Sequence, residues 1–277
     1  MKLKYAALGL LAVACAAPVQ SIVIRHDVDK NLYLTTEAPE ALVDMRHQGH
    51  GMLIAPEWVV TAAHTVFYDY KGKTITVGGR EREIEAVIFH PGYSKPAKGL
   101  FTGDSAPSQA YLRANHDIVL IKLKTPVADV APIKIYPAAD EAGKHVKLYG
   151  KGNTGTGETG QIAKTGGTLR WGENILTEAK DQWLTYKFDK GGDALPFEGM
   201  QGDGDSGGPA LIEIDGVQYV AGLASWDVYE GDIADFKGSL YGMEASVVRL
   251  SYYQSWIEDV MAWSDEKLAS HHHKIGS

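Results

Sequence analysis

The decapeptide QGDGDSGGPA, residues 201–210, places one serine among four glycines and two aspartates. Glycine destabilises ordinary strands and helices because it loses more conformational freedom on folding than any other residue. Its concentration around Ser206 therefore indicates a place where another molecule approaches the backbone closely. Without a Cβ at Gly204, the backbone N–H groups of Gly204 and Ser206 can converge on the oxygen of a bound carbonyl group.

A serine hydroxyl is a weak nucleophile at neutral pH and needs a base to take its proton. Upstream, VVTAAH (59–64) places His64 directly after an apolar strand, and NHDIVLIKL (115–123) places Asp117 before another. A carboxylate at the start of a buried strand needs a partner such as an imidazole N–H. A lone histidine or aspartate is usually structural, but the order His64, Asp117, Ser206 predicts a nucleophilic triad.

Two other motifs have competing interpretations. GDSGG (204–208) also fits the G-x-S-x-G pattern of α/β-hydrolases, but that fold needs an acid and a histidine after the serine. The only later histidines are residues 271–273, in a polar tail, so the pattern disfavours this fold. GTGETG (155–160) fits a dinucleotide-binding G-x-G-x-x-G, but no helical stripe follows it, which favours a glycine-rich surface loop.

Short apolar runs broken by Gly, Pro, Asn and Asp extend from Ile22 to about Leu250. Their β-branched content predicts an all-β sandwich or barrel. The exception begins at Ser251, which can cap a helix. Apolar residues then recur near helical spacing and predict a C-terminal amphipathic helix: Tyr252, Trp256, Ile257, Val260, Met261 and Trp263. The three adjacent tail histidines lack a fixed geometry, so no metal site is predicted there.

Composition excludes several classes of function. The 277 residues are 44% hydrophobic, which allows one large domain or two small ones with real cores. The net charge is −8 and no basic run is present, so nucleic acid is not an expected partner. No stretch after the N-terminal segment reaches 18 apolar residues, so we expect no membrane-spanning helix in the mature protein.

Residues 1–21, MKLKYAALGLLAVACAAPVQS, combine two early lysines with a short apolar run. This pattern is typical of a secretory signal peptide, so we expect a secreted or periplasmic protein. The only cysteine, Cys15, lies in this segment, which predicts a mature protein without disulfides. An alternative is a lipid anchor at Cys15, because AVAC loosely resembles a lipobox, although Ala12 stands where leucine is usual.

These motifs together resemble the chymotrypsin/trypsin family of serine proteases. Six stretches carry the resemblance in the family's order, from about Ile22 to Val260: GHGMLIAPEWVVTAAH, FHPGY, HDIVLIKL, GDSGGPAL, GLASW and SYYQSWIEDV. The resemblance implies two antiparallel six-stranded β-barrels with a C-terminal α-helix. We place the barrels at 22–130 and 131–265, between a signal peptide at 1–21 and a tail at 266–277.

The resemblance also implies a secreted serine endopeptidase that cleaves protein or peptide substrates through an acyl-enzyme, with no cofactor and no metal. Ser206 is then the nucleophile, His64 the general base and acid, and Asp117 the group that orients the imidazole. Gly204 and Ser206 supply the oxyanion hole. His116 stands where the family often has asparagine, and we interpret it as a neighbour of the triad.

In this family a buried carboxylate before the nucleophile pairs with a freed N-terminal amine. Here the pair is Asp205 and Ile22, and cleavage after Ser21 would expose that amine. The family usually continues with two glycines after Ile-Val, whereas Ile24 and Arg25 follow here.

Four residues are expected to bind substrate. The resemblance implies that Ser225 and Trp226 pair with an extended substrate backbone. Met200 stands where trypsin-like members have the aspartate that attracts Lys or Arg, but Asp227 and Asp203 still offer negative charge near the pocket. The sequence predicts no particular residue preference or oligomeric state. The alternative function is a protease-fold binding protein with little or no turnover.

Overall fold

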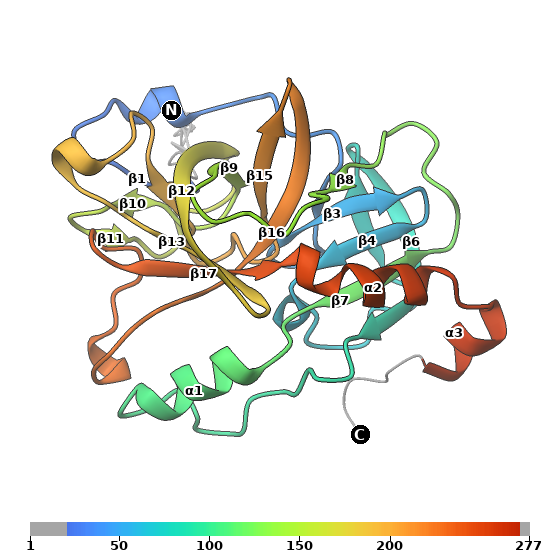
Figure 1. The fold of residues 1–277 in the computed structure, drawn as a ribbon. Coiled ribbons are helices and arrows are strands. Elements are labelled where there is room, and N and C mark those ends of the chain that lie inside the picture. Colours follow the sequence, from blue (N-terminus) through green and yellow to red (C-terminus); the bar gives the residue numbers. More distant parts are fainter. Residues whose placement is uncertain (1–20, 272–277) are drawn as a thin grey trace, which may run out of the picture.

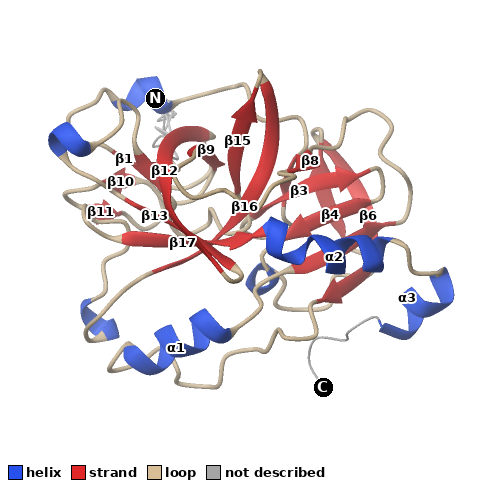
Figure 2. Cartoon of the chain, in the orientation of Figure 1, coloured by secondary structure: helices blue, strands red, loops and turns tan. Residues whose placement is uncertain are grey.

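A computed structural model describes residues 21–271. The predicted signal peptide up to residue 20, including the alternative lipid site at Cys15, and the tail from residue 272 onward lie outside the described residues. Within the described range, the chain forms two β-barrels that lie beside each other, with few helices (Figures 1 and 2). The predicted all-β class is confirmed.

The first barrel is closed in the strand order β2-β3-β4-β7-β6-β5. Strand β7 lies between β4 and β6 and buries every side chain except Lys122. The apolar run after Asp117 forms this strand, so Asp117 lies just before the strand begins. The six strands are β2 (Leu42–Asp44), β3 (His50–Ala55), β4 (Trp58–Thr61), β5 (Thr74–Val77), β6 (Arg80–Phe89) and β7 (Val119–Leu123).

The second barrel follows the order β15-β9-β12-β13-β17-β16 and is closed by the pairing of β15 with β16. The β15–β16 hairpin turns at Asp215-Gly216, whose φ values of 50° and 78° are those of the turn that Asp-Gly favours. A short parallel strand, β8 (Lys134–Ile135), joins the edge of β16. The barrel strands are β9 (His145–Gly150), β12 (Arg170–Lys180), β13 (Trp183–Lys187), β15 (Pro209–Ile214), β16 (Val217–Asp227) and β17 (Glu244–Arg249).

A small four-stranded sheet, in the order β11-β10-β1-β14, ties the start of the described chain to the second barrel. Strand β1 pairs in parallel with β10 and antiparallel with β14. The N-terminal residues thus cross to the half of the molecule that carries Ser206. The strands are β1 (Val23–Ile24), β10 (Gly155–Thr156), β11 (Gly160–Gln161) and β14 (Gly199–Met200).

The predicted C-terminal helix exists as α2 (Leu250–Met261), but two details of the prediction are wrong. Ser251 does not cap it: the cap position is Arg249, and the Ser251 hydroxyl lies one residue inside the helix, hydrogen-bonded to buried Glu141. Tyr252 is exposed, and Tyr253 packs into the core with Ile257 and Val260. The inward stripe therefore includes Tyr253 and not Tyr252, and its predicted members Ile257 and Val260 are buried as expected.

Two further α-helices were not predicted. Helix α1 (Ala106–Ala114) lies in the segment before Asp117, and α3 (Asp265–His271) follows α2 and inserts Leu268 into the core. Four short 3-10 helices complete the structure: η1 (Lys30–Tyr33), η2 (Ala63–Thr65), η3 (Gly191–Asp193) and η4 (Ile233–Asp235). No helix within residues 21–271 has both the length and the apolar character needed to cross a membrane.

Candidate active site

The three predicted triad residues meet between the two barrels. His64 Nδ1 lies 2.7 Å from Asp117 Oδ2, and His64 Nε2 lies 2.8 Å from Ser206 Oγ. Nδ1 therefore carries the proton that Asp117 accepts, and Nε2 can take the proton of the hydroxyl. The imidazole bridges a carboxylate from the first barrel and a hydroxyl from the second.

Local hydrogen bonds hold His64 in place. It sits in η2, directly after β4, and its backbone N–H donates to Asp117 Oδ1 at 2.8 Å. The Thr65 hydroxyl donates to Ala62 O at 2.8 Å, and the Tyr70 hydroxyl donates to Thr65 O at 3.2 Å. Because both the turn and the ring are fixed, Asp117 sets the position of His64 through two separate bonds.

Asp117 is buried, at 6% exposure, and keeps its charge because of its partners. Burial alone would raise its pKa, but His64 and the hydrogen bonds from His64 and Ser225 hold that pKa below its ordinary value. The Ser225 hydroxyl donates to Asp117 Oδ2 at 2.5 Å. For His64, burial would lower the pKa, and the charge of Asp117 and the bond to it outweigh burial, so the pKa is raised. The pair is thus built to stabilise an imidazolium.

Two glycines beside Ser206 each stand where a side chain would not fit. Gly204 has a φ of +95°, and a Cβ there would lie 3.0 Å from Gly152 Cα. Gly207 has a φ of +73°, and a Cβ there would lie 2.1 Å from His50 O. Within residues 21–271, the N–H groups of Gly204 and Ser206 donate to no protein acceptor. The loop therefore leaves two backbone donors beside the hydroxyl, as an oxyanion site requires.

Asp205, the residue before Ser206, points away from the cleft into the second barrel. It is buried, and its carboxylate accepts from Gly152 N at 2.7 Å, Gly202 N at 2.9 Å and Ile22 N at 3.3 Å. Burial raises its pKa to about 6, against the lowering effect of these backbone donors. Asp205 and Ile22 thus lie together.

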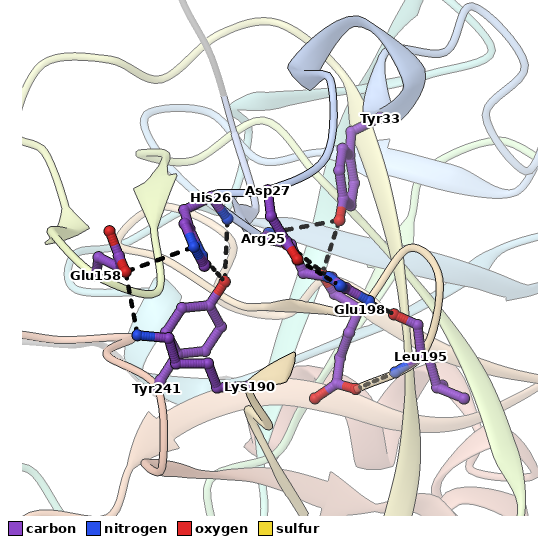
Figure 3. Close-up of polar contacts among 9 residues, drawn as sticks. All are labelled: Arg25, His26, Asp27, Tyr33, Glu158, Lys190, Leu195, Glu198 and Tyr241. Atoms are coloured by element: carbon purple, nitrogen blue, oxygen red, sulfur yellow. Dashed lines mark hydrogen bonds and ion pairs between the residues drawn. The ribbon is translucent and has the colours of Figure 1, made fainter. Parts of the chain in front are cut away.

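The segment after Ile24 is held by a polar cluster that involves three loops (Figure 3). Arg25 pairs with Asp27 at 2.7 Å and donates to Leu195 O at 2.7 Å. His26 Nδ1 lies 2.9 Å from Tyr241 Oη, and its Nε2 lies 3.5 Å from Glu158. Arg25, which stands at the position of the family's second glycine, and the following His26 therefore connect the N-terminal segment to the loops that contain Glu158, Leu195 and Tyr241.

Glu198 shapes the loop at residues 189–198, and Figure 3 shows its contacts with Leu195 and Tyr33. The Glu198 carboxylate accepts from Asp189 N at 2.5 Å and from Leu195 N at 2.6 Å, and Glu198 O accepts from the Tyr33 hydroxyl at 3.1 Å. This loop leads directly into β14 and then into the Ser206 turn. Through Tyr33, the N-terminal segment therefore stabilises the loop that leads to the Ser206 turn.

A cavity of about 220 Å³ opens beside Ser206. Among the predicted substrate-binding residues, Ser225, Trp226 and Asp227 line it, as does Asp203. Met200 does not: it is fully buried in the core of the second barrel. The next residue, Gln201, lines the cavity instead. Its Nε2 lies 3.3 Å from Trp226 O and 3.4 Å from Asp227 Oδ1. The floor of the cavity is thus polar.

Asp227 is the most perturbed acid in this cavity. Burial raises its pKa to about 7, and the nearby charge of Asp203 adds to the effect, although the bond from Gln201 opposes it. A carboxyl group that is costly to ionise gains most from a cationic or hydrogen-bond-donating ligand.

A second hollow, of about 470 Å³, lies on the other side of the Ser206 turn. It is lined by Gly204, by residues 47–50 of the first barrel and by residues 151–153 of the second. Two of its charged members, Asp44 and Lys151, pair with each other at 2.7 Å. The two hollows together make a cleft that passes across the nucleophile.

His116 is a neighbour of the triad. Its ring stacks on His90 with 4.4 Å between centroids, and its Nδ1 lies 2.9 Å from the Tyr253 hydroxyl. Burial lowers the pKa of His116, and burial together with the charge of His116 lowers that of His90 to about 4. The pair is therefore a neutral aromatic stack between the first barrel and α2.

The sequence reasoning missed the residues that close the cavity on its outer side. These are Phe101, Ser105, Ser108, Gln109 and Leu112 from the α1 segment, and Tyr229, Ile233 and Phe236 from the loop after β16. One signal was available: DSAPSQAYLRA contains a helix start, with a serine before the first turn and a proline in it. Among residues 21–271, no group of three or more His, Cys, Asp or Glu side chains is arranged to bind a metal.

The comparisons with known proteins agree with this architecture. The suppressor of tumorigenicity 14 protein homolog of Bos taurus is 29% identical over 254 residues, which cover 78% of this chain and 26% of the relative. This chain therefore spans about a quarter of that relative's length. A family model described as Trypsin matches residues 36–257, most of the chain and both barrels. With two closed barrels, the cleft between them and this match, the chain belongs to the chymotrypsin/trypsin family of serine proteases.

Proposed function

We propose that the protein is a serine peptidase in which Ser206, His64 and Asp117 act as the catalytic triad. The observation that carries the proposal is the continuous series of contacts Asp117–His64–Ser206, at 2.7 Å and 2.8 Å. The family match supports a peptidase with protein or peptide substrates.

The geometry supports a two-step mechanism. Ser206 Oγ attacks the substrate carbonyl carbon while His64 Nε2 takes its proton, and the carbonyl oxygen becomes an oxyanion near the N–H groups of Gly204 and Ser206. Nε2 then protonates the leaving amine, and an acyl-enzyme remains. Water, deprotonated by the same nitrogen, releases the acid product. In each step Asp117 stabilises the imidazolium that forms.

We also propose that processing after Ser21 activates the enzyme. Ile22 has a φ of +53°, which is strained for a β-branched residue. Cleavage before Ile22 removes the preceding carbonyl group and with it this strain. The new ammonium group would stand beside the buried Asp205 carboxylate and lower its raised pKa, as an opposite charge does.

Export follows as part of the same proposal. The signal-like composition of residues 1–21 supplies a route to the mature Ile22 terminus during secretion. Ser21 is fully buried where it stands, so cleavage has to precede the docking of β1 against β14. Mass spectrometry of the exported protein tests whether its chain starts at Ile22. An active protein that starts before Ile22 would exclude activation by cleavage after Ser21.

The decisive experiment combines labelling with a matched pair of variants. An organophosphorus reagent should label Ser206 alone, and a peptide library should be hydrolysed. Ser206→Ala should lose labelling and about 10⁶ in kcat. Ser255→Ala, an exposed serine on α2, should keep both. Binding of peptides with no hydrolysis by the unmodified protein would instead support the alternative of a protease-fold binding protein.

A further inference from the structure

Residues 103–109, which we call the strap, cross the cleft from the first barrel to the loop after β16. Ser105 N donates to Gly231 O at 2.9 Å, and Ile233 N donates to Gly103 O at 2.7 Å. The Ser105 hydroxyl donates to Tyr229 O and accepts from Gly231 N, each at 3.1 Å. In Figure 1 the α1 helix that continues the strap lies beside the orange loop that contains residues 231–236. The strap is thus fastened by both backbone and side chain.

The strap also covers the edge of β16 that faces away from β17, near Asp227. Val228 N donates to Glu244 O on the β17 side. Because successive strand residues direct their backbone groups to opposite sides, the Asp227 N–H and C=O face away from β17 and into the cleft. There Asp227 O already accepts from Gln109 Nε2 at 3.3 Å. The carbonyl that an added strand would use is therefore occupied by the protein's own side chain.

The strap divides one groove into two compartments. The inner compartment, about 220 Å³, contains Ser206, and the outer one, about 450 Å³, lies beyond the strap. Ser105, Gln109 and Tyr229 line both, so they form the partition. Ser105 is only 2% exposed. On the opposite side of Ser206, by contrast, the hollow of about 470 Å³ has no such partition among the residues that line it.

Among the residues that line the inner compartment, two side-chain acceptors and one donor, Trp226 Nε1, are buried without a partner within the described chain. Gln109 Oε1 and Gln201 Oε1 are buried and have no partner within the described chain. The orientation of Gln109 is fixed, because only its NH₂ group can donate to Asp227 O. Its free oxygen therefore lies close to that carbonyl, where a buried acceptor is costly unless a ligand supplies a donor. A primary ammonium group has three donors and matches this position.

The length of substrate that fits follows from strand geometry. A substrate antiparallel to β16, with the residue before the cut opposite Ser225, places the residue two positions earlier opposite Asp227. That third position is the one Gln109 occupies. We propose that the strap limits the substrate to two residues on the N-terminal side of the scissile bond, and that Gln109 Oε1 receives the free α-ammonium group of the second. This inference rests on the proposed peptidase function.

The experiment measures kcat/KM for a series of peptidyl anilides with one, two, three or four residues before the anilide, each with a free or acetylated N-terminus. The residue before the cut is taken from the library profile. The two-residue substrate with a free amine should be best, and a third residue or an acetyl group should lower kcat/KM at least about tenfold, since each displaces a buried hydrogen bond. A kcat/KM that is unchanged or rises with three or four residues would overturn the inference.

Variants locate the effect in the strap. Gln109→Ala and Ser105→Ala should each raise the relative kcat/KM of the three-residue substrate about tenfold, and Gln109→Ala should abolish the preference for a free amine. Gln254→Ala, on α2, removes a side chain that is hydrogen-bonded to exposed Glu258, and it should keep the unmodified length profile. An unchanged profile in Gln109→Ala would overturn the inference.

The organophosphorus reagent separates the two proposals, because it is small enough to reach Ser206 past the strap. An unmodified protein that is neither labelled nor active on any substrate refutes the peptidase function itself. One that is labelled and cleaves the four-residue substrate best refutes only the strap inference. Labelling of each variant also shows that its active site is folded.

Discussion

His64 Nε2 lies 2.8 Å from the Ser206 hydroxyl oxygen, although 142 residues separate them along the chain. The two groups come from different barrels, so their contact exists only while the barrels are docked. Asp117 determines which nitrogen of His64 faces the serine as an acceptor. It accepts from Nδ1 and leaves Nε2 to accept the serine proton.

Activity should depend on the protonation of His64. Asp117 raises the pKa of His64 above its ordinary value near 6.5, and only the neutral imidazole can accept the serine proton. The rate should therefore be low in acid and rise with pH, with a midpoint above 6.5. A pH profile of kcat/KM checks this. A midpoint well below 6.5 would show that Asp117 does not stabilise the charged ring.

Asp117→Asn should lower kcat by about 10⁴ without unfolding the protein. An amide cannot stabilise an imidazolium, and its NH₂ group favours the wrong tautomer of His64. The acidic limb of the pH profile should also move to lower pH, because burial alone lowers the pKa of His64. Equal activity in the variant and the unmodified protein would remove Asp117 from the mechanism.

Asp205→Asn should cost both activity and stability. Each carboxylate oxygen accepts from at least one buried backbone N–H, so a side-chain NH₂ group at either position faces a donor. We expect a loss of about 2–4 kcal/mol in the free energy of unfolding, measured in urea. Asp215→Asn, in the exposed β15–β16 turn, is the matched control and should change it by less than about 0.5 kcal/mol.

Gly207→Ala should be far more destabilising than Gly216→Ala. Both glycines have similar φ values, +73° and +78°, so both substitutions carry the same backbone strain of about 1–2 kcal/mol. At Gly207, however, the new Cβ would lie 2.1 Å from His50 O, whereas at Gly216 nothing lies within 4 Å. Equal unfolding free energies for the two variants would contradict the close approach of the barrels at Gly207.

The His90–His116 stack should make the fold sensitive to acid. The pKa of His90 is about 4 in the folded chain and near 6.5 when unfolded, so between these values the unfolded state binds more protons. The free energy of unfolding should fall by about 1–2 kcal/mol as pH drops from 6.5 to 4. His90→Phe should flatten this dependence, and His145→Phe, which removes an exposed histidine, should retain it. An undiminished slope in His90→Phe would exclude the stack as its source.

Several elements followed from local pattern. The order of VVTAAH, NHDIVLIKL and GDSGG predicted the fold, and it predicted that His64, Asp117 and Ser206 lie together, because each motif combines a buried strand with a reactive residue at its end. Helix α2 was also predictable from its spacing. The sequence did not show which of two adjacent tyrosines belongs to its inward face. Tyr252 and Tyr253 are equally apolar in sequence, and only the packing of Tyr253 against the core distinguishes them.

Helix α1 and the strap depended on long-range structure. The helix has a local start signal, but its importance comes from bonds between Ser105 and Gly231 and between Gln109 and Asp227, which join segments more than a hundred residues apart. The exclusion of Met200 from the cavity has the same origin. Gln201 covers it by bonding to Trp226 and Asp227, whose position depends on how β16 closes the second barrel.

By itself the sequence determined which groups are present and which strands bring them to the surface, because strand periodicity and glycine placement are local properties. Only the tertiary structure decided how much room a substrate has. The cleft is formed by loops from both barrels, and its length depends on hydrogen bonds across it that no local pattern encodes.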